Sequence, residues 1–451
     1  MRRIEYNLSV TVLTFEDARR RVEDHARDLR KPDSERVDLL SAPGRILAES
    51  INADRDLPPF PRATRDGFAV RAEDVAQFPA TLKVIAEIAA GQDVGNVSIS
   101  HGECVEIMTG AAVPTGADAV VMVEYSVWQT FLSADSAVSP NSPSSSPDHN
   151  STGHGGRTPS SGDSSTAEVQ INRSVAPGEN IVPRGTEARA GQVLLEPGAR
   201  LSPAAIGVAA SVGLSEVVVF TQPRIAILST GDELVDVSTR PAPHQIRNSN
   251  TYSLAAQVIR TGAVSVPLPI APDDEPILRH LIEEGLDSDL LLLTGGVSMG
   301  KYDLVEKVLS ELGAEFIFTG VHIQPGKPAV FGRVQWNGAT KYFFGLPGNP
   351  VSTMVTFELF ARPIIDALSG AAPQPLRYTQ AKLKREIRTK TGLTRFLPAE
   401  LTGEFANLEV ELVRWQGSGD MVATARANCL AVIPPDRERI APGEFISVLK
   451  L

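Results

Sequence analysis

Strands and helices alternate between residues 221 and 369, and no other feature of the sequence constrains the fold as strongly. Short apolar runs, of which RIAILS, DLLLLT and KYFFG are examples, have the length of buried strands. Between them lie SNTYSLAAQVIRTG, DEPILRHLIEEGL and DLVEKVLSELG, whose apolar residues recur at helical intervals. Strands that alternate with helices predict a largely parallel sheet that helices cover on both faces. The predicted fold class is therefore a multidomain protein with a central three-layer α/β domain.

The segments outside this stretch predict a different architecture. The run FEDARRRVEDHARDL forms an amphipathic helix, and a second helix is predicted near residues 42–50. Residues 80–125 alternate short β-prone runs with glycine and proline, which is typical of a small β-rich domain. The final segment, 372–451, lacks helical stripes and predicts a second β-rich module.

Composition excludes several classes of protein. The formal net charge of −11 argues against a general nucleic-acid binder. No apolar run approaches the roughly 18 residues of a membrane helix, and the N-terminus lacks the continuous apolar core of a signal peptide. Two cysteines, Cys104 and Cys429, without a CxxC pair make a disulfide framework or a structural zinc site improbable. The sequence predicts a cytoplasmic protein without a nucleic-acid or membrane partner.

One internal segment, 133–167, consists of serine, proline and glycine with almost nothing apolar. Such a composition buries too little surface to offset its ordering entropy, so we predict disorder. Because β-prone runs flank the segment, we interpret it as an expanded loop and not as a domain linker. We do not interpret His149 and His154 inside it as a metal site.

Three glycine loops follow predicted strands of the α/β stretch: STGDE (229–233), TGGVSMG (294–300) and GLPGNPVS (345–352). In open parallel sheets, ligands bind beyond the carboxyl ends of the strands. Glycines let a ligand approach the backbone, and the loops add hydroxyl donors. Asp232 and Asp303 offer carboxylates to a hard cation, and Lys327 lies on the turn QPGKP. The loops together predict a cradle for a phosphate or another oxyanion, with a divalent metal.

Structural roles remain open for the single residues. Asp232 or Asp303 alone is also consistent with a helix cap. Asp66, in LPPFPRATRDGFAV, is equally consistent with a loop salt bridge to Arg62 or Arg65.

Familiar nucleotide motifs are missing. In GVHIQPGKP, five residues separate Gly320 from Gly326, and Pro328 follows Lys327 where a P-loop has Ser or Thr. No GxGxxG opens a helix, and neither GxSxG nor HExxH occurs.

The order TGGVSMGKYD, PGKP, GLPGNPVS resembles the molybdopterin-binding domain of molybdenum insertases, the MoeA and gephyrin E-domain family. The resemblance extends over nearly the whole chain. LPPFPRATRDGFAV is similar to the family's proline loop, and IMTGAAVPTGADAVVMVE to its M-T-G-A and G-A-D-A-V-V signature. GENIVPRGTEARAGQVLL and STGDEL also match.

This resemblance implies four regions. They are an elongated region (11–56 and 174–220), an inserted β-rich domain (57–173), the α/β molybdopterin-binding domain (221–370) and a C-terminal β domain (372–451). It also implies a homodimer whose cleft combines the β insertion of one subunit with the α/β domain of the other. The implied reaction transfers molybdate into adenylylated molybdopterin, releases AMP and uses Mg²⁺. The implied partners are the upstream molybdopterin adenylyltransferase and recipient molybdoenzymes.

The site residues follow from the loops and from matching positions in the family's motifs. The predicted catalytic residues are Asp66, Asp232, Asp303 and Lys327, of which Asp232 and Asp303 also bind the metal. The predicted substrate-binding residues are Thr109, Thr230, Asn248, Thr294, Gly295, Gly296, Ser298, Gly326, Pro347, Gly348, Ser352 and Ser418.

The sequence departs from the family's pattern at three positions. Asn248 replaces the aspartate of I-R-D-S-N, Gln324 the first lysine of K-P-G-K, and Glu187 stands where aspartate is common. These changes bear on metal and molybdate geometry more than on the fold. Two alternative functions remain: a nucleotide-pyrophosphate hydrolase that uses the same α/β domain, and a non-catalytic scaffold like the family's receptor-clustering members.

Overall fold

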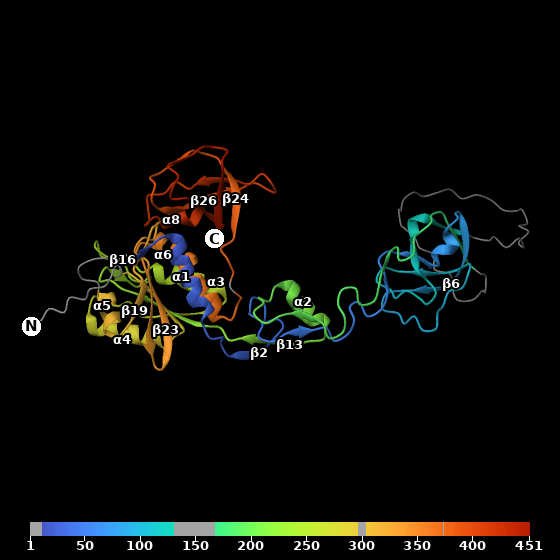
Figure 1. The fold of residues 1–451 in the computed structure, drawn as a ribbon, viewed down its shortest axis with the longest axis horizontal. Coiled ribbons are helices and arrows are strands. Elements are labelled where there is room, and N and C mark those ends of the chain that lie inside the picture. The colour runs from blue at the N-terminus through green and yellow to red at the C-terminus, as the bar shows by residue number, and fades with distance from the viewer. Residues whose placement is uncertain (1–10, 130–166, 296–303, 373) are drawn as a thin grey trace, which may run out of the picture. The chain divides into compact units, whose positions relative to one another are not determined.

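The computed structural model describes residues 11–129, 167–295, 304–372 and 374–451. The chain divides into two compact units (Figure 1). One unit comprises Ile51–Leu194, and the other combines Met1–Ser50 with Leu195–Leu451. Within the described ranges, no helix combines the length and the apolar character that crossing a bilayer requires.

The larger unit contains a sheet with the strand order β17-β14-β18-β23-β22-β19. The strands β17, β14, β18 and β23 run parallel, whereas β22 and β19 are antiparallel to their neighbours. The prediction of a largely parallel sheet is therefore confirmed. The bounds are β14 Arg224–Ser229, β17 Val264–Pro267, β18 Leu290–Thr294, β19 Glu315–Phe318, β22 Val330–Trp336 and β23 Ala339–Leu346.

Helices cover both faces of this sheet, because alternate strand residues point to opposite sides. On one face, Ile225 and Leu292 pack in a core with α1, α3, α6 and α7. On the other face, Ala226 and Leu293 pack with α4 and α5. A π-helical turn, Phe357–Ala361, joins α6 to α7. The bounds are α1 Phe15–Arg27, α3 Asn250–Thr261, α4 Glu275–Leu286, α5 Leu304–Glu311, α6 Pro350–Thr356 and α7 Arg362–Leu368.

The predicted helix near residues 42–50 is wrong. Gly44 has a φ of +79°, and Pro43 precedes it, so the chain turns at this point. The backbones of Ile46 and Leu47 form β-bridges with Arg200 and Val219. These bridges use backbone N–H and C=O groups that a helix would need for its own hydrogen bonds. Beside this segment, β2 (Ser34–Asp38) pairs with β13 (Glu216–Phe220), and Ser202 caps α2 (Pro203–Ser211).

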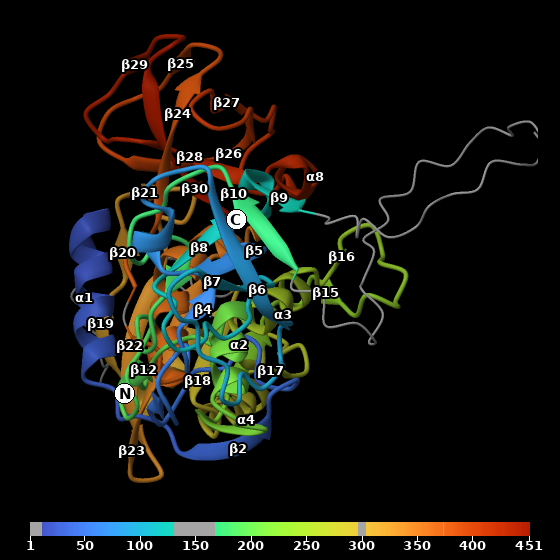
Figure 2. The same ribbon diagram turned by 90° about the vertical axis from the view of Figure 1, so that its right-hand side faces the viewer.

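The smaller unit is built on a sheet with the strand order β8-β5-β7-β6-β10-β9 (Figure 2). Strands β9 and β10 pair antiparallel and flank the segment 133–167, which agrees with an expanded loop between neighbouring strands. The predicted disorder itself falls on residues outside the described ranges, apart from Ala167. The bounds are β5 Gly67–Val70, β6 Ala80–Ile88, β7 Glu103–Ile107, β8 Ala119–Met122, β9 Ser126–Gln129 and β10 Glu168–Ile171.

The C-terminal module is β-rich, as predicted, with one short helix, α8 (Met421–Arg426). Its sheet has the order β21-β26-β27-β24-β30-β28, with an additional pairing of β26 and β28. Strand β21 (Ile323–Gln324) comes from the α/β part of the chain and pairs parallel with β26. The other bounds are β24 Tyr378–Leu383, β26 Thr394–Thr402, β27 Glu409–Leu412, β28 Cys429–Ile433 and β30 Phe445–Lys450.

Candidate functional site

The sheet register brings the three glycine loops to one edge. Ser229 at the end of β14 pairs with Thr294 at the end of β18, and Thr294 pairs with Leu346 at the end of β23. Three parallel strands thus end side by side, and each continues into a glycine loop. We call the described part of this arrangement, residues 229–233, 294–295 and 345–352, the glycine-loop edge. Ligands of parallel sheets bind at such an edge.

Glycine is required at position 295 because the first and second loops pack backbone against backbone. Gly295 has a φ of +88°, and a Cβ atom at this position would lie 2.4 Å from the carbonyl oxygen of Thr230. A Cβ atom on Gly348 would lie 3.5 Å from the Cα of Gly295. The first, second and third loops are therefore in successive contact, and main-chain groups form much of the surface.

Asn250, the first residue of α3, links two of these loops. Its amide nitrogen donates to the hydroxyl of Thr294 at 2.9 Å and to the carbonyl of Gly348 at 2.8 Å. Our sequence reasoning missed this residue. Its signal was a polar side chain at the start of the predicted helix SNTYSLAAQVIRTG.

Asn248 is buried, and hydrogen bonds within the chain engage its side chain. Its amide oxygen accepts from the Ser229 hydroxyl at 3.1 Å and from the backbone N–H of Thr251 at 3.2 Å. Its amide nitrogen donates to the Thr251 hydroxyl at 2.9 Å. The neutral amide thus both accepts and donates, and it ties the end of β14 to the start of α3.

Thr230 carries a hydroxyl without a hydrogen-bond partner among the described residues, although only 4% of the residue is exposed. Its backbone N–H donates to the carbonyl of Thr294 at 3.0 Å. Buried hydroxyls are normally satisfied, so an orphan next to Gly295 is a candidate contact for a ligand.

Asp232 is exposed, and one of its carboxylate oxygens accepts from the backbone N–H of Asp273 at 2.9 Å. Burial, followed by the negative charges of Asp232 and Glu233, raises the pKa of Asp273. Carboxylate oxygens are the kind of ligand that a hard cation prefers. Within the described ranges, however, no three His, Cys, Asp or Glu side chains form a complete metal cluster. The sequence analysis did not identify Asp273.

Gly296 and Ser298 of the second loop, and Asp303 three residues after it, lie outside the described residues.

The QPGKP turn packs on α6. Gly326 has a φ of +110°, and a Cβ atom on it would lie 2.5 Å from the methyl group of Thr356. Lys327 is exposed and makes no salt bridge with any described residue, which leaves its charge available to an anion. Lys327 is therefore a candidate anion contact on a turn that cannot shift toward α6.

The C-terminal glycine loop contacts the start of α6. The carbonyl of Ser418 accepts from the backbone N–H of Val351 at 3.0 Å. Ser352, the next residue of α6, is buried, and the carbonyl of Pro347 accepts from the Thr353 hydroxyl. Two predicted substrate-binding residues that are far apart in sequence, Ser352 and Ser418, thus lie at neighbouring positions.

In the smaller unit, Asp66 and Thr109 meet. One oxygen of Asp66 accepts from the backbone N–H of Thr109 at 2.6 Å and from its hydroxyl at 2.8 Å. These two bonds hold the pKa of Asp66 below its usual range. The next residue must be glycine, because a Cβ atom on Gly67 would lie 1.9 Å from the carbonyl oxygen of Val121. We call Asp66, Gly67 and Thr109 the Asp66 turn.

The alternative reading of Asp66 as a salt-bridge residue is not observed among the described residues. Arg62 pairs instead with Glu187 at 2.7 Å, and Arg65 makes no salt bridge with any residue that the structure describes. The departure at position 187 thus keeps a carboxylate as partner for Arg62.

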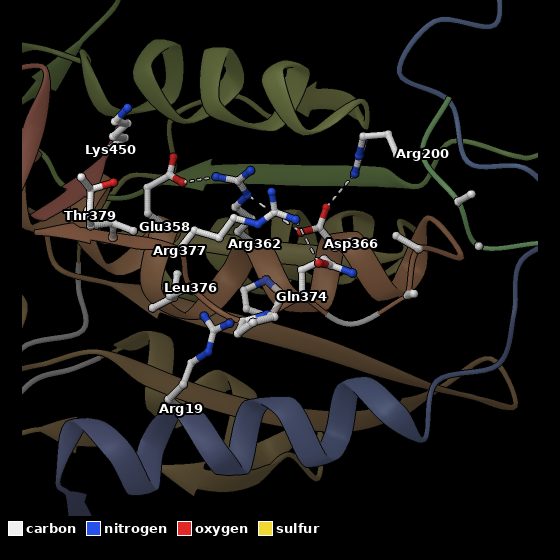
Figure 3. Close-up of a pocket in the computed structure, with 17 residues that line it drawn as sticks. Arg19, Arg200, Glu358, Arg362, Asp366, Gln374, Leu376, Arg377, Thr379 and Lys450 are labelled. Atoms are coloured by element: carbon white, nitrogen blue, oxygen red, sulfur yellow. Dashed lines mark hydrogen bonds and ion pairs between the residues drawn. The ribbon is translucent and has the colours of Figure 1, made fainter. Parts of the chain in front are cut away.

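One cavity, of about 730 Å³, is lined by none of the predicted site residues (Figure 3). Its two carboxylates are paired. Glu358 accepts from Gln257 at 2.8 Å and from Arg362 at 3.0 Å, and Asp366 pairs with Arg200 at 2.9 Å. Both carboxylates of the cavity thus have structural partners, and we assign no chemical role to them.

Three family models match consecutive parts of the chain. They are the MoeA N-terminal region (domains I and II) over residues 13–213, a probable molybdopterin binding domain over 226–367, and the MoeA C-terminal region (domain IV) over 380–451.

Individual relatives extend over most of the chain. A molybdopterin molybdenumtransferase from a Nostoc species is 32% identical over 429 residues, covering 93% of this chain and 89% of the relative. Its counterpart from a Synechocystis species is 33% identical over 410 residues, covering 90% and 93%. A crystal structure of a MoeA protein from Pyrococcus horikoshii superposes with a TM-score of 0.72 at 26% identity, covering 98% of this chain and 100% of that one. The chain therefore belongs to the molybdopterin molybdenumtransferase (MoeA) family.

Proposed function

We propose that this protein inserts molybdate into adenylylated molybdopterin and releases AMP. The names of the relatives support the transferase class. The single structural observation that carries the proposal is the meeting of three glycine loops at one sheet edge. Both substrates are anions, and an edge of close-packed backbone with nearby hydroxyls suits their oxygens.

Binding of the pterin phosphate belongs to the glycine-loop edge in this proposal. The proposed contacts within the described residues are the orphan hydroxyl of Thr230, the hydroxyl of Thr294, the half-buried backbone of Gly295 and the exposed backbone of Gly348. Gly296, Ser298, Gly326, Pro347, Ser352 and Ser418 complete the proposed set, and Asn248 positions β14 against α3 from behind.

Charge at the site comes from two directions. Lys327 offers a cation that no described carboxylate neutralises. Asp232 and Asp303 would hold Mg²⁺, which when bound offsets negative charge on phosphate oxygens. The backbone N–H of Asp273 donates to the Asp232 carboxylate. This hydrogen bond restricts the side chain of Asp232 to one orientation.

Asp66 takes part as an acceptor. Its lowered pKa keeps it ionised near neutrality, so it is unsuited to donate a proton. Both hydrogen bonds from Thr109 go to the same carboxylate oxygen of Asp66. The other carboxylate oxygen has no partner among the described residues. We propose that this oxygen accepts a hydrogen bond from the substrate.

We also propose the assembly and setting that the family resemblance implies. The protein is a cytoplasmic homodimer, in which the Asp66 turn of one subunit contributes to the site at the glycine-loop edge of the other. Molybdopterin adenylyltransferase supplies its substrate. The finished cofactor passes to recipient molybdoenzymes.

Reconstitution tests this function. The purified protein is incubated with adenylylated molybdopterin and molybdate, and the product is added to a molybdoenzyme lacking its cofactor. We expect recovery of that enzyme's activity together with AMP. A product that leaves the acceptor inactive while AMP accumulates would contradict the proposal.

A further inference from the structure

The cavity shown in Figure 3 lies where several distant parts of the chain converge within the larger unit. Its lining comes from α1 (Arg19), from the segment 198–200, from α7 and its flanks (358–372), and from the C-terminal module (374–379 and 449–450). We call this space the α7 cavity. Its volume of about 730 Å³ falls within the range of small-molecule sites, roughly 300–1,000 Å³.

The lining of the α7 cavity is strongly cationic. Five of its side chains are basic and two are acidic, in a chain whose formal net charge is −11. The two acids already have cationic partners, since Glu358 lies 3.0 Å from Arg362 and Asp366 lies 2.9 Å from Arg200. The basic residues are Arg19, Arg200, Arg362, Arg377 and Lys450. An acidic protein that gathers positive charge in one hollow attracts an anion to it.

Arg377 and Lys450 carry charges that no carboxylate of the described chain offsets. Arg377 donates to the side-chain oxygen of Gln374 at 3.3 Å, which is a neutral partner, and Lys450 forms no ion pair with any described residue. Strands β24 and β30 pair Tyr378 with Leu449, so Arg377 and Lys450, one residue further along each strand, lie at facing positions. Like charges at facing positions repel each other, and an anion bound by both would offset that repulsion.

Part of the α7 cavity excludes water. Burial raises the pKa of Asp366 even though Arg200 and Arg362 act in the opposite direction. Opposite charges attract more strongly where water is excluded. Apolar side chains form another part of the wall: Pro363, Pro375, Leu376 and Leu449. A ligand that fits this lining combines negative charge with an apolar group.

We propose that the α7 cavity binds a phosphate monoester that carries an apolar organic group. A monoester has a charge of about −1.5 to −2 near neutrality, which matches the two unpaired cations better than a single carboxylate does. The guanidinium of Arg377 suits two phosphate oxygens, and Lys450 adds a point charge. No residue proposed for the molybdate reaction lines this cavity, so the inference does not rest on the proposed function.

The test is calorimetric titration of the full-length protein with phenyl phosphate and with inorganic phosphate. Arg377→Gln combined with Lys450→Gln removes both unpaired cations and retains polar side chains. We expect the affinity for phenyl phosphate to fall about 10- to 100-fold, the scale of lost hydrogen bonds between charged groups. Inorganic phosphate should bind the wild-type protein about tenfold more weakly than phenyl phosphate, because it cannot bury an apolar ring.

Two control variants separate the α7 cavity from other cations. Lys390→Gln removes an exposed lysine of the C-terminal module that does not line the cavity, and it should change the affinity less than about twofold. Lys327→Ala removes the cation of the QPGKP turn, and this variant should still bind phenyl phosphate. Arg377 and Lys450 are exposed, so the double variant should keep its melting temperature. If it does not fold, Arg377→Lys replaces it, with an expected loss of about threefold because the charge remains and the fork is gone.

Each outcome decides the inference without deciding the proposed function. Weaker binding of phenyl phosphate in the double variant, with binding kept in both controls, supports the inference. Unchanged binding in the double variant, or loss of binding in Lys327→Ala instead, overturns it. A wild-type protein that does not bind phenyl phosphate also overturns it. Equal affinity for the two phosphates overturns the contact with an apolar group, and with it the assignment to an ester.

Discussion

Main-chain groups hold the glycine-loop edge together, whereas side chains build the Asp66 turn. At the edge, Gly295 lies against the Thr230 carbonyl and Gly348 lies against Gly295. At the turn, one carboxylate is held by the N–H and the hydroxyl of Thr109. The first region presents a shape lined by backbone and hydroxyl groups, and the second presents a single oriented negative charge.

This difference teaches where each kind of substitution acts. Adding a methyl group at the edge disturbs the packing of the three loops. The stability of the fold and the affinity for the ligand should therefore decrease together. Neutralising the carboxylate at the turn leaves the packing unchanged, because an asparagine has the same shape. The two regions should therefore separate stability from chemistry.

The largest effect is expected for Gly295→Ala. The new Cβ would lie 2.4 Å from the Thr230 carbonyl, on a residue with a φ of +88°. We expect a loss of about 2–4 kcal/mol in the free energy of unfolding and loss of pterin binding, measured by denaturant titration and calorimetry. Gly443→Ala is the matched control, since its φ is +86° and nothing lies within 4 Å. Equal losses for both variants would mean that the loops are not close-packed.

Asp66→Asn should do the reverse and leave the fold intact. We expect single-turnover AMP release to fall roughly a hundredfold, the scale for loss of an important electrostatic contact. The melting temperature should fall only slightly, because the amide oxygen of asparagine can still accept both bonds from Thr109. Asp93→Asn is the control, because Asp93 is an exposed aspartate of the same unit that bonds only a local backbone N–H. A full rate in the Asp66 variant would reduce the turn to a structural feature.

Mixed dimers test whether the two regions serve one site across subunits. In this account Asp66→Asn lowers turnover and Lys327→Ala weakens binding of the anionic substrates, so each variant alone should have little activity when the substrates are below saturation. Random pairing should restore about a quarter of wild-type activity, because half of the dimers then carry one intact site out of two. Activity that stays at the level of the separate variants would place both residues in sites within a single subunit.

Thr109→Val should have the smallest effect. It removes the hydroxyl bond to Asp66 and keeps the backbone bond, which is the larger cause of the lowered pKa. The pKa of Asp66 should therefore rise partway toward its usual value. Because a depressed pKa contributes stability that is lost as the pH falls through it, the variant should also lose less stability in acid.

Carboxyl NMR of selectively labelled protein measures the pKa, with Asp66→Asn identifying the signal. A pKa that does not move in Thr109→Val would show that the hydroxyl is not bonded to Asp66 in solution.

The fold could be predicted where the hydrophobic periodicity is strong and no long-range backbone pairing overrides it. The buried run DLLLLT and the helix SNTYSLAAQVIRTG, which Gly262 ends at a φ of +91°, were read correctly from local pattern. Residues 42–50 were not, because long-range bridges of Ile46 and Leu47 determine their conformation, and Pro43 and Gly44 already disfavour a helix.

The site divides in the same way. Glycine loops after strands are a local signal, and the register shows that they share one edge. Asp273 carries no such signal, since it acquires its partner Asp232 only through the fold.

Release of AMP with and without molybdate tests the central claim most directly. The wild-type protein is mixed with adenylylated molybdopterin in a single turnover, and AMP is followed over time in the two conditions. The account predicts that AMP release depends on molybdate and that cofactor appears with the same time course. Release at the same rate without molybdate would contradict it and would indicate a pyrophosphate hydrolase built on the same glycine-loop edge.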